Sequence, residues 1–516
     1  MTSAKVITRN LFANWIGHGS NLVVMFFLSP FIVHTLGVTQ YGVWQILTVL
    51  TGYMGILDLG VRASTGRYII LYLGKKEFDK VDETIRTGLG MYTALGGLIF
   101  LSGCILGVFF PVLFPSVPQE YRFTVAILLP VLAVNIWISA VRTVLSSVLS
   151  AHDRFDLARG SDLVMLAVRT LGTIFALIWG FGLVGLAVAV IGCNIVGLTI
   201  NFFLARRVHH GLCLWPLLFK RERISELYRY GLGAFAIAIC GKIIGQTDLV
   251  LVGNLINLEA VAIYSVGAML LYYSDTLLGQ ITTTLFPPLQ RAIAAGEMDS
   301  ARRLVFRQVR LSMVLGLLMY VGYFTFCESF INLWMFHPDI FPLAAVKSAA
   351  QVMAILSCSK LLTLFGFGSR TVLAATGHIG FAAKMTVVES LTNLLLSIIF
   401  VVVFDLGLIG VALGTLVARL LTTTAVLPLY ACKKMGINVC HFVTEIGGRG
   451  IVAGMCFLVA ASSVQRLLPS SNWLEFFIQV AVAVVLYCPI ALLFLVPRDD
   501  RKIIFTKFRN TVQGNV

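Results

Sequence analysis

Long apolar segments separated by short polar ones run along the whole chain of 516 residues. A membrane-spanning helix needs about 20 consecutive apolar residues, and fourteen segments are long enough. The pattern therefore predicts an all-α polytopic membrane protein with about fourteen transmembrane helices. We expect these helices near 11–36, 41–61, 87–110, 124–149, 160–179, 183–205, 230–254, 260–286, 308–328, 344–367, 384–404, 407–430, 450–468 and 474–496. Pro30, Pro130 and the pair Pro287 and Pro288 are expected to kink or end helices.

Composition and charge agree with this interpretation. Hydrophobic residues make up 58% of the chain and charged residues only 12%, whereas a soluble domain carries about 25% charge. The net charge of +15 would suggest a nucleic-acid partner in a soluble protein, but cytoplasmic loops of membrane proteins also collect Lys and Arg. With the N-terminus inside, only Arg122, Lys347 and Arg466 lie in outer segments. Both termini are therefore predicted to be cytoplasmic, and no nucleic-acid partner is expected.

The two halves of the chain resemble each other. Val148–Ala151 precedes Gly182–Gly185, and the similar Val372–Ala375 precedes Gly407–Gly410, at offsets of about 220 to 225 residues. Because the offset contains six predicted helices, both copies have the same orientation in the membrane. We expect two homologous six-helix lobes, followed by two helices outside the repeat.

The repeat predicts four segments of the chain. These are an N-terminal lobe over 1–205, a basic cytoplasmic connector over 206–229, a C-terminal lobe over 230–432, and a final segment over 433–516. The final segment holds a cytoplasmic loop, the last two helices and a basic tail, whose stretch 498–509 resembles an interfacial anchor.

The connector combines cations with Leu, Trp and Phe. Such a mixture can lie along the membrane surface with its aromatic side down and its cations towards anionic headgroups. An ordinary solvated loop is the alternative. The basic residues concerned are Arg206, Arg207, Lys220, Arg221, Arg223 and Arg229.

Several charged residues fall within the predicted spans. A charge at the centre of a bilayer costs at least ~2.5–3.5 kcal/mol. The cations outnumber the acids, so we expect them to line a cavity and to face water or an anionic ligand. Ion pairing between helices, for example of Lys242 with Asp275, is the alternative. The cations are Arg142, Arg169, Lys242, Lys360 and Arg419, and the acids, which are also candidates for ion coupling, are Asp248, Asp275 and Glu389.

The repeat and the uncharged polar residues add to this picture. Applying the offset to Arg169 leads to Asn393, and applying it to Arg419 leads to Asn194, so the charges do not recur in both lobes. A role in function explains such asymmetry better than a role in the scaffold. Polar stripes on the first and eleventh helices predict either a cavity lining or hydrogen bonds between helices. They consist of Asn14, His18 and Asn21, and of Glu389 and Asn393.

Cysteines predict neither a disulfide framework nor a metal centre. The ten cysteines show no paired spacing outside the predicted spans. Cys432, Cys440 and His441 would supply three metal ligands without a fourth. We expect no metal and no cofactor.

Short motifs near the start of each lobe carry a family resemblance. They are Asn14-Trp15, Leu28–Phe31, Leu36-Gly37, Tyr41–Trp44 and Leu57–Arg62 in the first lobe, and Glu259–Tyr264 in the second. With them the chain resembles the polysaccharide transporter family. These proteins are bacterial flippases of lipid-linked oligosaccharides within the multidrug/oligosaccharidyl-lipid/polysaccharide exporter superfamily.

The resemblance implies a function without covalent chemistry. It implies alternating access of two lobes around a cation-lined cavity in the bacterial inner membrane. The cargo would be an oligosaccharide linked to polyprenyl pyrophosphate, moved from the inner to the outer leaflet for cell-surface polysaccharide synthesis, with H⁺ or Na⁺ as candidate coupling ions. Polysaccharide polymerases and glycosyltransferases would be partners beside membrane lipids. Asp58 and Arg62 would serve conformational change rather than binding.

Two other functions fit a polytopic protein less well. A multidrug or cation antiporter of the same fold should present acids, rather than an excess of cations, to its substrates. A membrane polysaccharide polymerase or ligase should need a sizeable outer loop, and the predicted outer loops are short.

The predicted topology can be tested with single cysteines in a cysteine-free background. Cysteines at Ser116 and Ser471 should react with a membrane-impermeant reagent applied to intact cells, because both positions lie in predicted outer loops. A cysteine at Ser300, in a predicted inner loop, should stay unlabelled. Labelling at position 300 would contradict the topology.

Overall fold

The computed structural model describes the backbone of residues 4–497 and 501, and the side chains of 19–229, 231, 235, 246–497 and 501. Within these residues the chain is helical, and its only β feature is a bridge between His337 and Phe341. Twelve described helices are long and apolar enough to cross a membrane. The prediction of an all-α polytopic membrane protein is confirmed.

Twelve helices and fourteen predicted spans agree once two local features are considered. Helix α1 (Ala4–Met54) contains Gly37, whose φ of 77° and ψ of 163° are not helical, so α1 consists of two helices joined at a kink. Gly37 lies in the gap between the predicted spans 11–36 and 41–61. Helix α7 (Arg221–Leu255) contains the predicted span 230–254, and most of its central side chains lie outside the described residues.

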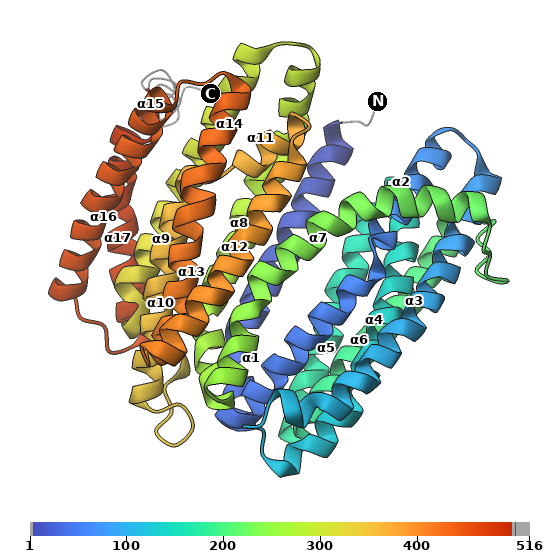
Figure 1. The fold of residues 1–516 in the computed structure, drawn as a ribbon, viewed down its shortest axis with the longest axis horizontal. Coiled ribbons are helices and arrows are strands. Elements are labelled where there is room, and N and C mark those ends of the chain that lie inside the picture. The colour runs from blue at the N-terminus through green and yellow to red at the C-terminus, as the bar shows by residue number, and fades with distance from the viewer. Residues whose placement is uncertain (1–3, 498–500, 502–516) are drawn as a thin grey trace. The chain divides into compact units, whose positions relative to one another are not determined.

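Contacts divide the chain into two compact units, Met1–Ala262 and Ile263–Val516. In the first unit α3 packs on α4, and α6 packs on both α4 and α5 (Figure 1). Helix α7 packs on α1, α2 and α3, so the connector predicted over 206–229 lies within this unit. The other helices of the unit are α2 (Val61–Gly74), α3 (Phe78–Leu113), α4 (Gln119–Ala151), α5 (Phe155–Ile178) and α6 (Gly182–Val208).

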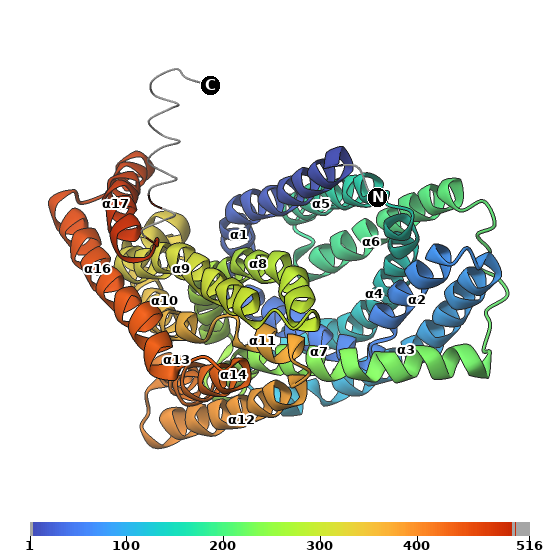
Figure 2. The same ribbon diagram turned by 90° about the horizontal axis from the view of Figure 1, so that it is seen from above.

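The second unit repeats these helix pairs. Helix α9 packs on α10, and α13 packs on both α10 and α12, which matches α3 on α4 and α6 on α4 and α5. Helices α16 and α17 pack on each other and along α9, outside the repeated helices (Figures 1 and 2). The helices are α8 (Leu258–Ala294), α9 (Met298–Met335), α10 (Leu343–Thr363), α11 (Ser369–Ala375), α12 (Ile379–Ile398), α13 (Gly407–Arg419), α14 (Leu427–Met435), α15 (Val439–Phe442), α16 (Arg449–Leu467) and α17 (Trp473–Phe494).

Several spans are interrupted by irregular turns. The 3₁₀ segment η1 (Gly55–Asp58) joins α1 to α2, and η2 (Leu364–Gly366) separates α10 from α11. A π-helical segment, η4 (Leu420–Val426), follows α13 directly. The prolines that were expected to kink or end helices lie inside α1, α4 and α8, and none of them ends a helix.

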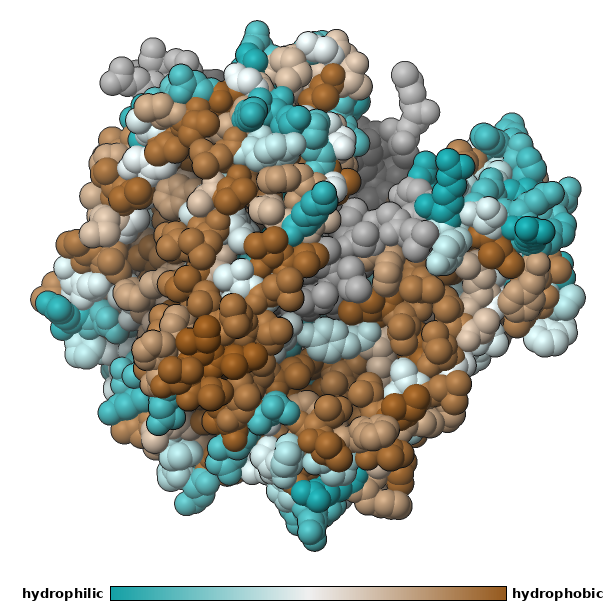
Figure 3. Space-filling view, in the orientation of Figure 1, coloured by the Kyte–Doolittle hydropathy of each residue, from teal (hydrophilic) through white to brown (hydrophobic). Residues whose placement is uncertain are grey.

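Hydrophobic residues cover the middle of the helices. On the face seen in Figure 3, brown apolar residues occupy the central stretches, and teal hydrophilic residues gather towards the helix ends. Exposed apolar side chains such as Val108, Val112 and Phe123 would be unfavourable in water and suit contact with lipid. The surface is that of a protein solvated by a bilayer.

The connector is fixed to α3 rather than lying free. Arg86 Nε donates to the Pro216 carbonyl at 2.8 Å, and Lys220 and Arg223 both pair with Glu83. The Arg223 side chain is 13% exposed, so it faces carboxylates and not headgroups, whereas Trp215 is 75% exposed. For Arg223 this arrangement differs from the expectation that the connector cations face anionic headgroups.

A tyrosine completes the polar contact beneath the connector. Tyr72 of α2 donates to Glu226 at 2.8 Å and accepts from Arg223 Nη1 at 2.6 Å. Burial, together with the hydrogen bond to Glu226, raises the pKa of Tyr72 to about 12. The phenol is therefore protonated at neutral pH and ties α2 to the start of α7.

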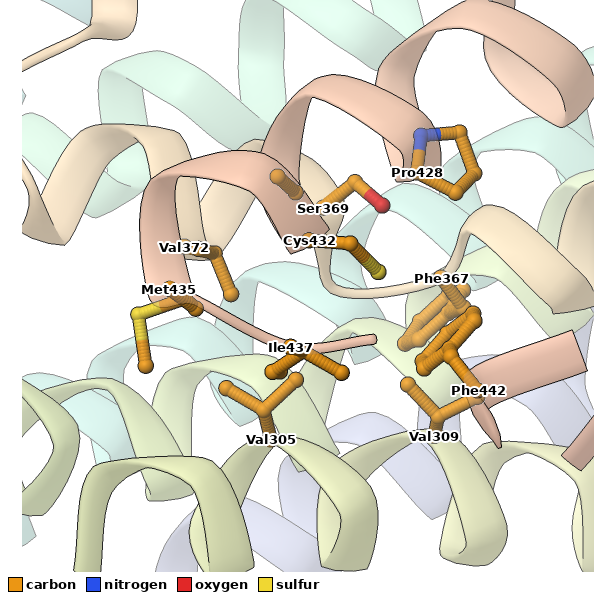
Figure 4. Close-up of a pocket in the computed structure, with 11 residues that line it drawn as sticks. Val305, Val309, Phe367, Ser369, Val372, Pro428, Cys432, Met435, Ile437 and Phe442 are labelled. Carbon is orange, nitrogen blue, oxygen red and sulfur yellow. The ribbon is translucent and has the colours of Figure 1, made fainter. Parts of the chain in front are cut away.

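The second unit contains a small apolar seam rather than a ligand pocket at the end of α9. Val305 and Val309 of α9 point towards Ile437, Phe442 and Phe367 (Figure 4). The cavity between them measures ≈ 10 Å³, and a single water needs about 10–15 Å³. We regard it as a packing seam between α9, α11, α14 and α15.

Glycine is required where η1 meets α7. Gly60 has φ +76°, and a Cβ atom at this position would lie 2.1 Å from the Gly231 carbonyl oxygen. No L side chain fits there without movement of the backbone. The Asp58 carboxylate accepts from the Gly60 N–H at 2.8 Å and holds the turn.

Substitution of Gly60 by Ala should lower the melting temperature of the purified protein. Left-handed backbone and overpacking each cost about 1–3 kcal/mol. Gly74→Ala is the matched control, because nothing lies within 4 Å of a Cβ at Gly74. Equal melting temperatures for both variants would contradict the close approach of Gly60 to α7.

Candidate functional site

One cluster of charges in the second unit is centred on Asp275 of α8. Its carboxylate accepts from Lys360 Nζ of α10 and, at 3.0 Å, from the Tyr320 hydroxyl of α9. The Lys360 side chain is 15% exposed and that of Asp275 43% exposed. Three helices therefore contribute to this ion pair, and its carboxylate is open on one side.

A second cluster surrounds Glu389 of α12, whose side chain is 4% exposed. Its Oε1 lies 3.6 Å from Arg419 Nε of α13, and its Oε2 lies 3.2 Å from Arg370 Nη2 of α11. Thr422 and Thr423 of η4 donate to Oε2 at 3.2 and 2.6 Å. A single buried carboxylate therefore holds two guanidinium groups.

The π-helical segment η4 makes this arrangement possible. It begins at Leu420, directly after Arg419, and it brings two consecutive hydroxyls, those of Thr422 and Thr423, to the same carboxylate oxygen. In a regular α-helix neighbouring side chains point in different directions, and π segments are frequent at functional sites.

The two clusters are connected. Arg419 Nη1 donates to the Ser359 hydroxyl at 3.4 Å, next to Lys360 in the chain. The Lys360 ammonium is also within electrostatic range of Arg419 and Glu389. Three cations, Lys360, Arg370 and Arg419, thus share two carboxylates, and the network has an excess of positive charge.

The first unit contains a related cluster around Asp162 of α5. Its two oxygens pair with Arg142 Nη1 of α4 at 3.3 Å and with Arg159 Nη1 at 3.0 Å. Arg142 is 18% exposed and crosses α6 at Gly197, where a Cβ atom would lie 3.0 Å from Arg142 Cδ. Again one carboxylate serves two arginines.

Arg169 stands apart from these ion pairs. It lies in the middle of α5, its side chain is exposed, and no described residue gives it a hydrogen bond or an ion pair. Arg169 and Arg142 are both within electrostatic range of Cys193 on α6. The first unit therefore places Arg142 beside Asp162 and, nearby, Arg169, to which no described residue gives a hydrogen bond or an ion pair.

Two pairs of residues at equivalent positions of the repeat make a similar contact between helices, but only one of the pairs carries a charge. Asn194 Nδ2 donates to Asn135 Oδ1 at 3.0 Å between α6 and α4. The residues about 224–225 positions later, Arg419 and Ser359, make the corresponding contact between α13 and α10. Because a neutral amide satisfies the contact in the first unit, packing alone does not require the charge of Arg419.

The other residues expected to line a cavity are dispersed. Asn393, the counterpart of Arg169, is buried and accepts from Ser397 at 3.0 Å and from Thr415 at 3.3 Å, so it serves helix packing. Asn21 is exposed on α1. The side chains of Asn14, His18 and Lys242 lie outside the described residues.

Asp248 and Asp58 occupy different settings. Asp248 is half-buried on α7, beside Thr247, whose hydroxyl meets the Tyr53 hydroxyl at 3.1 Å. Asp58 Oδ2 lies 3.7 Å from Arg62 Nε within the turn that joins α1 to α2. That position fits a conformational role better than a binding role.

Sequence reasoning missed several members of the clusters. Asp162 lies at the edge of its span, where a charge signals little, although its spacing of three residues from Arg159 predicts a local pair. Arg370 follows the break at Gly366–Gly368, which was not recognised as an interruption of the tenth span. Tyr320, Ser359 and Thr423 carry no signal of their own in a single sequence.

Comparisons with known proteins agree with the fold and the motifs. Residues 92–336 match the family described as polysaccharide biosynthesis protein. The uncharacterized membrane protein EpsK of Bacillus subtilis is 20% identical over 98% of both chains. The probable low-salt glycan biosynthesis flippase Agl15 of Haloferax volcanii is 22% identical over 57% of this chain and 58% of its own. The resemblance to the polysaccharide transporter family is confirmed.

Solved structures share the fold of this chain. An inward-facing multidrug resistance MATE family transporter of the MOP superfamily superposes with a TM-score of 0.70 at 16% identity, over 80% of this chain and 94% of its own. The lipid II flippase MurJ in an inward closed conformation gives 0.67 at 14% identity, over 95% and 99%. At such identities the likeness establishes the fold and leaves the cargo to be argued from the charges.

Substitution of Glu389 by Gln should destabilise the protein. It leaves Arg419, which is 13% exposed, without its carboxylate, and breaking a buried pair costs about 3–5 kcal/mol. We expect a lower melting temperature and lower abundance in the membrane, with recovery when Arg419→Gln is added.

Asp299→Asn is the matched control for this experiment. It removes the same charge from a pair with Arg302 in which the acid is 82% exposed, and exposed pairs contribute only about 0–1 kcal/mol. Unchanged stability of Glu389→Gln would show that Glu389 does not hold the arginines.

Proposed function

We propose that the protein is a flippase that moves an oligosaccharide linked to polyprenyl pyrophosphate from the inner to the outer leaflet of the bacterial inner membrane. The observation that supports it is positive charge within the helices: in the second unit Lys360, Arg370 and Arg419 share Asp275 and Glu389, and in the first unit Arg169 has no described partner. The named functions of Agl15 and MurJ support a flippase of lipid-linked sugars.

The cargo chemistry fits this charge distribution. A pyrophosphate that links a lipid to a sugar is a compact dianion, and arginine binds phosphate oxygens through two parallel hydrogen bonds. The pyrophosphate loses hydration when it enters the protein. Attraction to cations that carboxylates neutralise only in part compensates for this loss. The sugar needs a hydrated path, and the polyprenyl tail can stay in lipid, so the protein has to offer affinity only for the headgroup.

Transport would follow from alternating access, in which the cargo-binding site opens first to one side of the membrane and then to the other. Asp275 is suited to couple an ion to this cycle, because its half-exposed carboxylate holds Lys360 and Tyr320. Binding of a coupling cation at Asp275 would release Lys360 for the pyrophosphate. Glu389 and Asp248 are the further candidates for H⁺ or Na⁺ coupling.

The alternative function is that of a multidrug antiporter, because the chain shares its fold with a MATE family transporter. A cationic drug would meet a surplus of positive charge in both units, which disfavours binding. We therefore prefer the anionic cargo. In this proposal both termini are cytoplasmic, no covalent step is needed, and glycosyltransferases and a polymerase act before and after the flippase.

Arg169→Gln should reduce flipping of a lipid-linked oligosaccharide in proteoliposomes by about tenfold or more, since a charge-assisted hydrogen bond contributes about 1.5–3 kcal/mol. Abundance and melting temperature should stay at the wild-type values, because no described residue pairs with Arg169. Arg169→Lys should retain part of the activity if charge alone is needed.

Arg466→Gln is the matched control. Arg466 is exposed near the end of α16, outside the repeated helices, and likewise has no partner within the described part of the chain. Wild-type flipping by Arg169→Gln, or an equal loss in the control, would contradict a role of Arg169 in binding cargo.

A further inference from the structure

A basic groove lies along the first part of α9, from Asp299 to Val314, away from the clusters described above. Its volume is ≈ 870 Å³, and the end of α17 and α15 form its other walls. Four arginines of one helix line it together with His441. They are Arg302, Arg303, Arg307 and Arg310.

Two of these arginines are held by the protein. Arg302 pairs with Asp299 at 3.0 Å and donates to the Met435 carbonyl at 2.9 Å. Arg310 lies 3.5 Å from Glu445. Their guanidinium groups contribute to the positive potential of the groove but have carboxylate partners of their own.

Within the described part of the chain, the other two arginines have no carboxylate partner. Arg303 donates only to the Ser300 hydroxyl, at 2.9 Å, and Arg307 has neither a hydrogen bond nor an ion pair to a described residue. Both side chains are exposed. They offer an adjacent pair of guanidinium groups, one helical turn apart, to an anion.

The lining of the groove changes from basic to apolar along α9. Beyond the arginines it is lined by Leu311 and Val314, and by Leu495 and Val496, which directly follow α17. The predicted span of α9 begins near residue 308, so the arginines lie at the membrane boundary and the apolar residues lie within the hydrocarbon. The groove is therefore cationic where phospholipid headgroups lie and apolar where their chains begin.

We propose that this groove is a binding site for one anionic phospholipid. Arg303 and Arg307 bind the phosphate, and the first part of an acyl chain lies against Leu311, Val314 and Val496. Basic pockets between transmembrane helices bind acidic headgroups through the same chemistry. The site is separate from the proposed cargo site and does not depend on the flippase function.

The test measures lipid binding by the purified full-length protein in neutral detergent. Phosphatidylglycerol, phosphatidylcholine with the same acyl chains, and inorganic phosphate are titrated separately, and bound ligand is counted by native mass spectrometry. Phosphatidylglycerol should bind tightest. The double substitution Arg303→Gln with Arg307→Gln should weaken its affinity roughly tenfold or more, because two charge-assisted contacts are lost.

Lys75→Gln with Lys76→Gln is the matched control, since it removes the same charge from an exposed turn that does not line the groove. If the double variant is poorly produced, Arg307→Gln alone serves, because Arg307 has no described partner to lose. Unchanged phosphatidylglycerol affinity in the arginine variants would overturn the proposal. So would equal binding of phosphatidylcholine, or inorganic phosphate that binds as tightly as the lipid.

Discussion

An ionised side chain inside a bilayer must be paired or hydrated, because otherwise it costs at least ~2.5–3.5 kcal/mol. This constraint orders the charges of both units. Asp162, Asp275 and Glu389 each contact at least one cation, and two of them contact two. The cations remain in excess after this pairing. Such a charge distribution is stable only where water or an anionic ligand reaches the surplus charge.

The same pairs link charge to helix geometry. Glu389 connects α11, α12 and α13 with the π-helical segment η4, and Asp275 connects α8, α9 and α10. Any change in the protonation or partners of these carboxylates therefore acts on several helices at once. The breaks at η1 and η2, next to Gly60 and Gly368 with their positive φ angles, are places where helices can change direction.

The sequence predicted the spans well because apolar length determines them, and Gly37 marks the gap expected between the first two. It also identified Arg142, Lys360 and Arg419 as charges within spans. Their partners depend on which helices meet, and a single sequence contains little of that information. Thus Lys242 was considered as the partner of Asp275, whereas the described partner is Lys360, and Asp162 was overlooked. The repeat offset, applied to both members of a contact, would have related Asn135 and Asn194 to Ser359 and Arg419.

The central claim is that positive charge in the membrane helices selects a pyrophosphate. It is tested most directly by flipping in proteoliposomes of two glycolipids with the same polyprenyl chain and sugar, one linked by pyrophosphate and the other by a neutral ether. We predict that only the pyrophosphate-linked lipid is moved, and that inorganic pyrophosphate on the entry side competes with it. Equal rates for both lipids, without competition, would contradict the account.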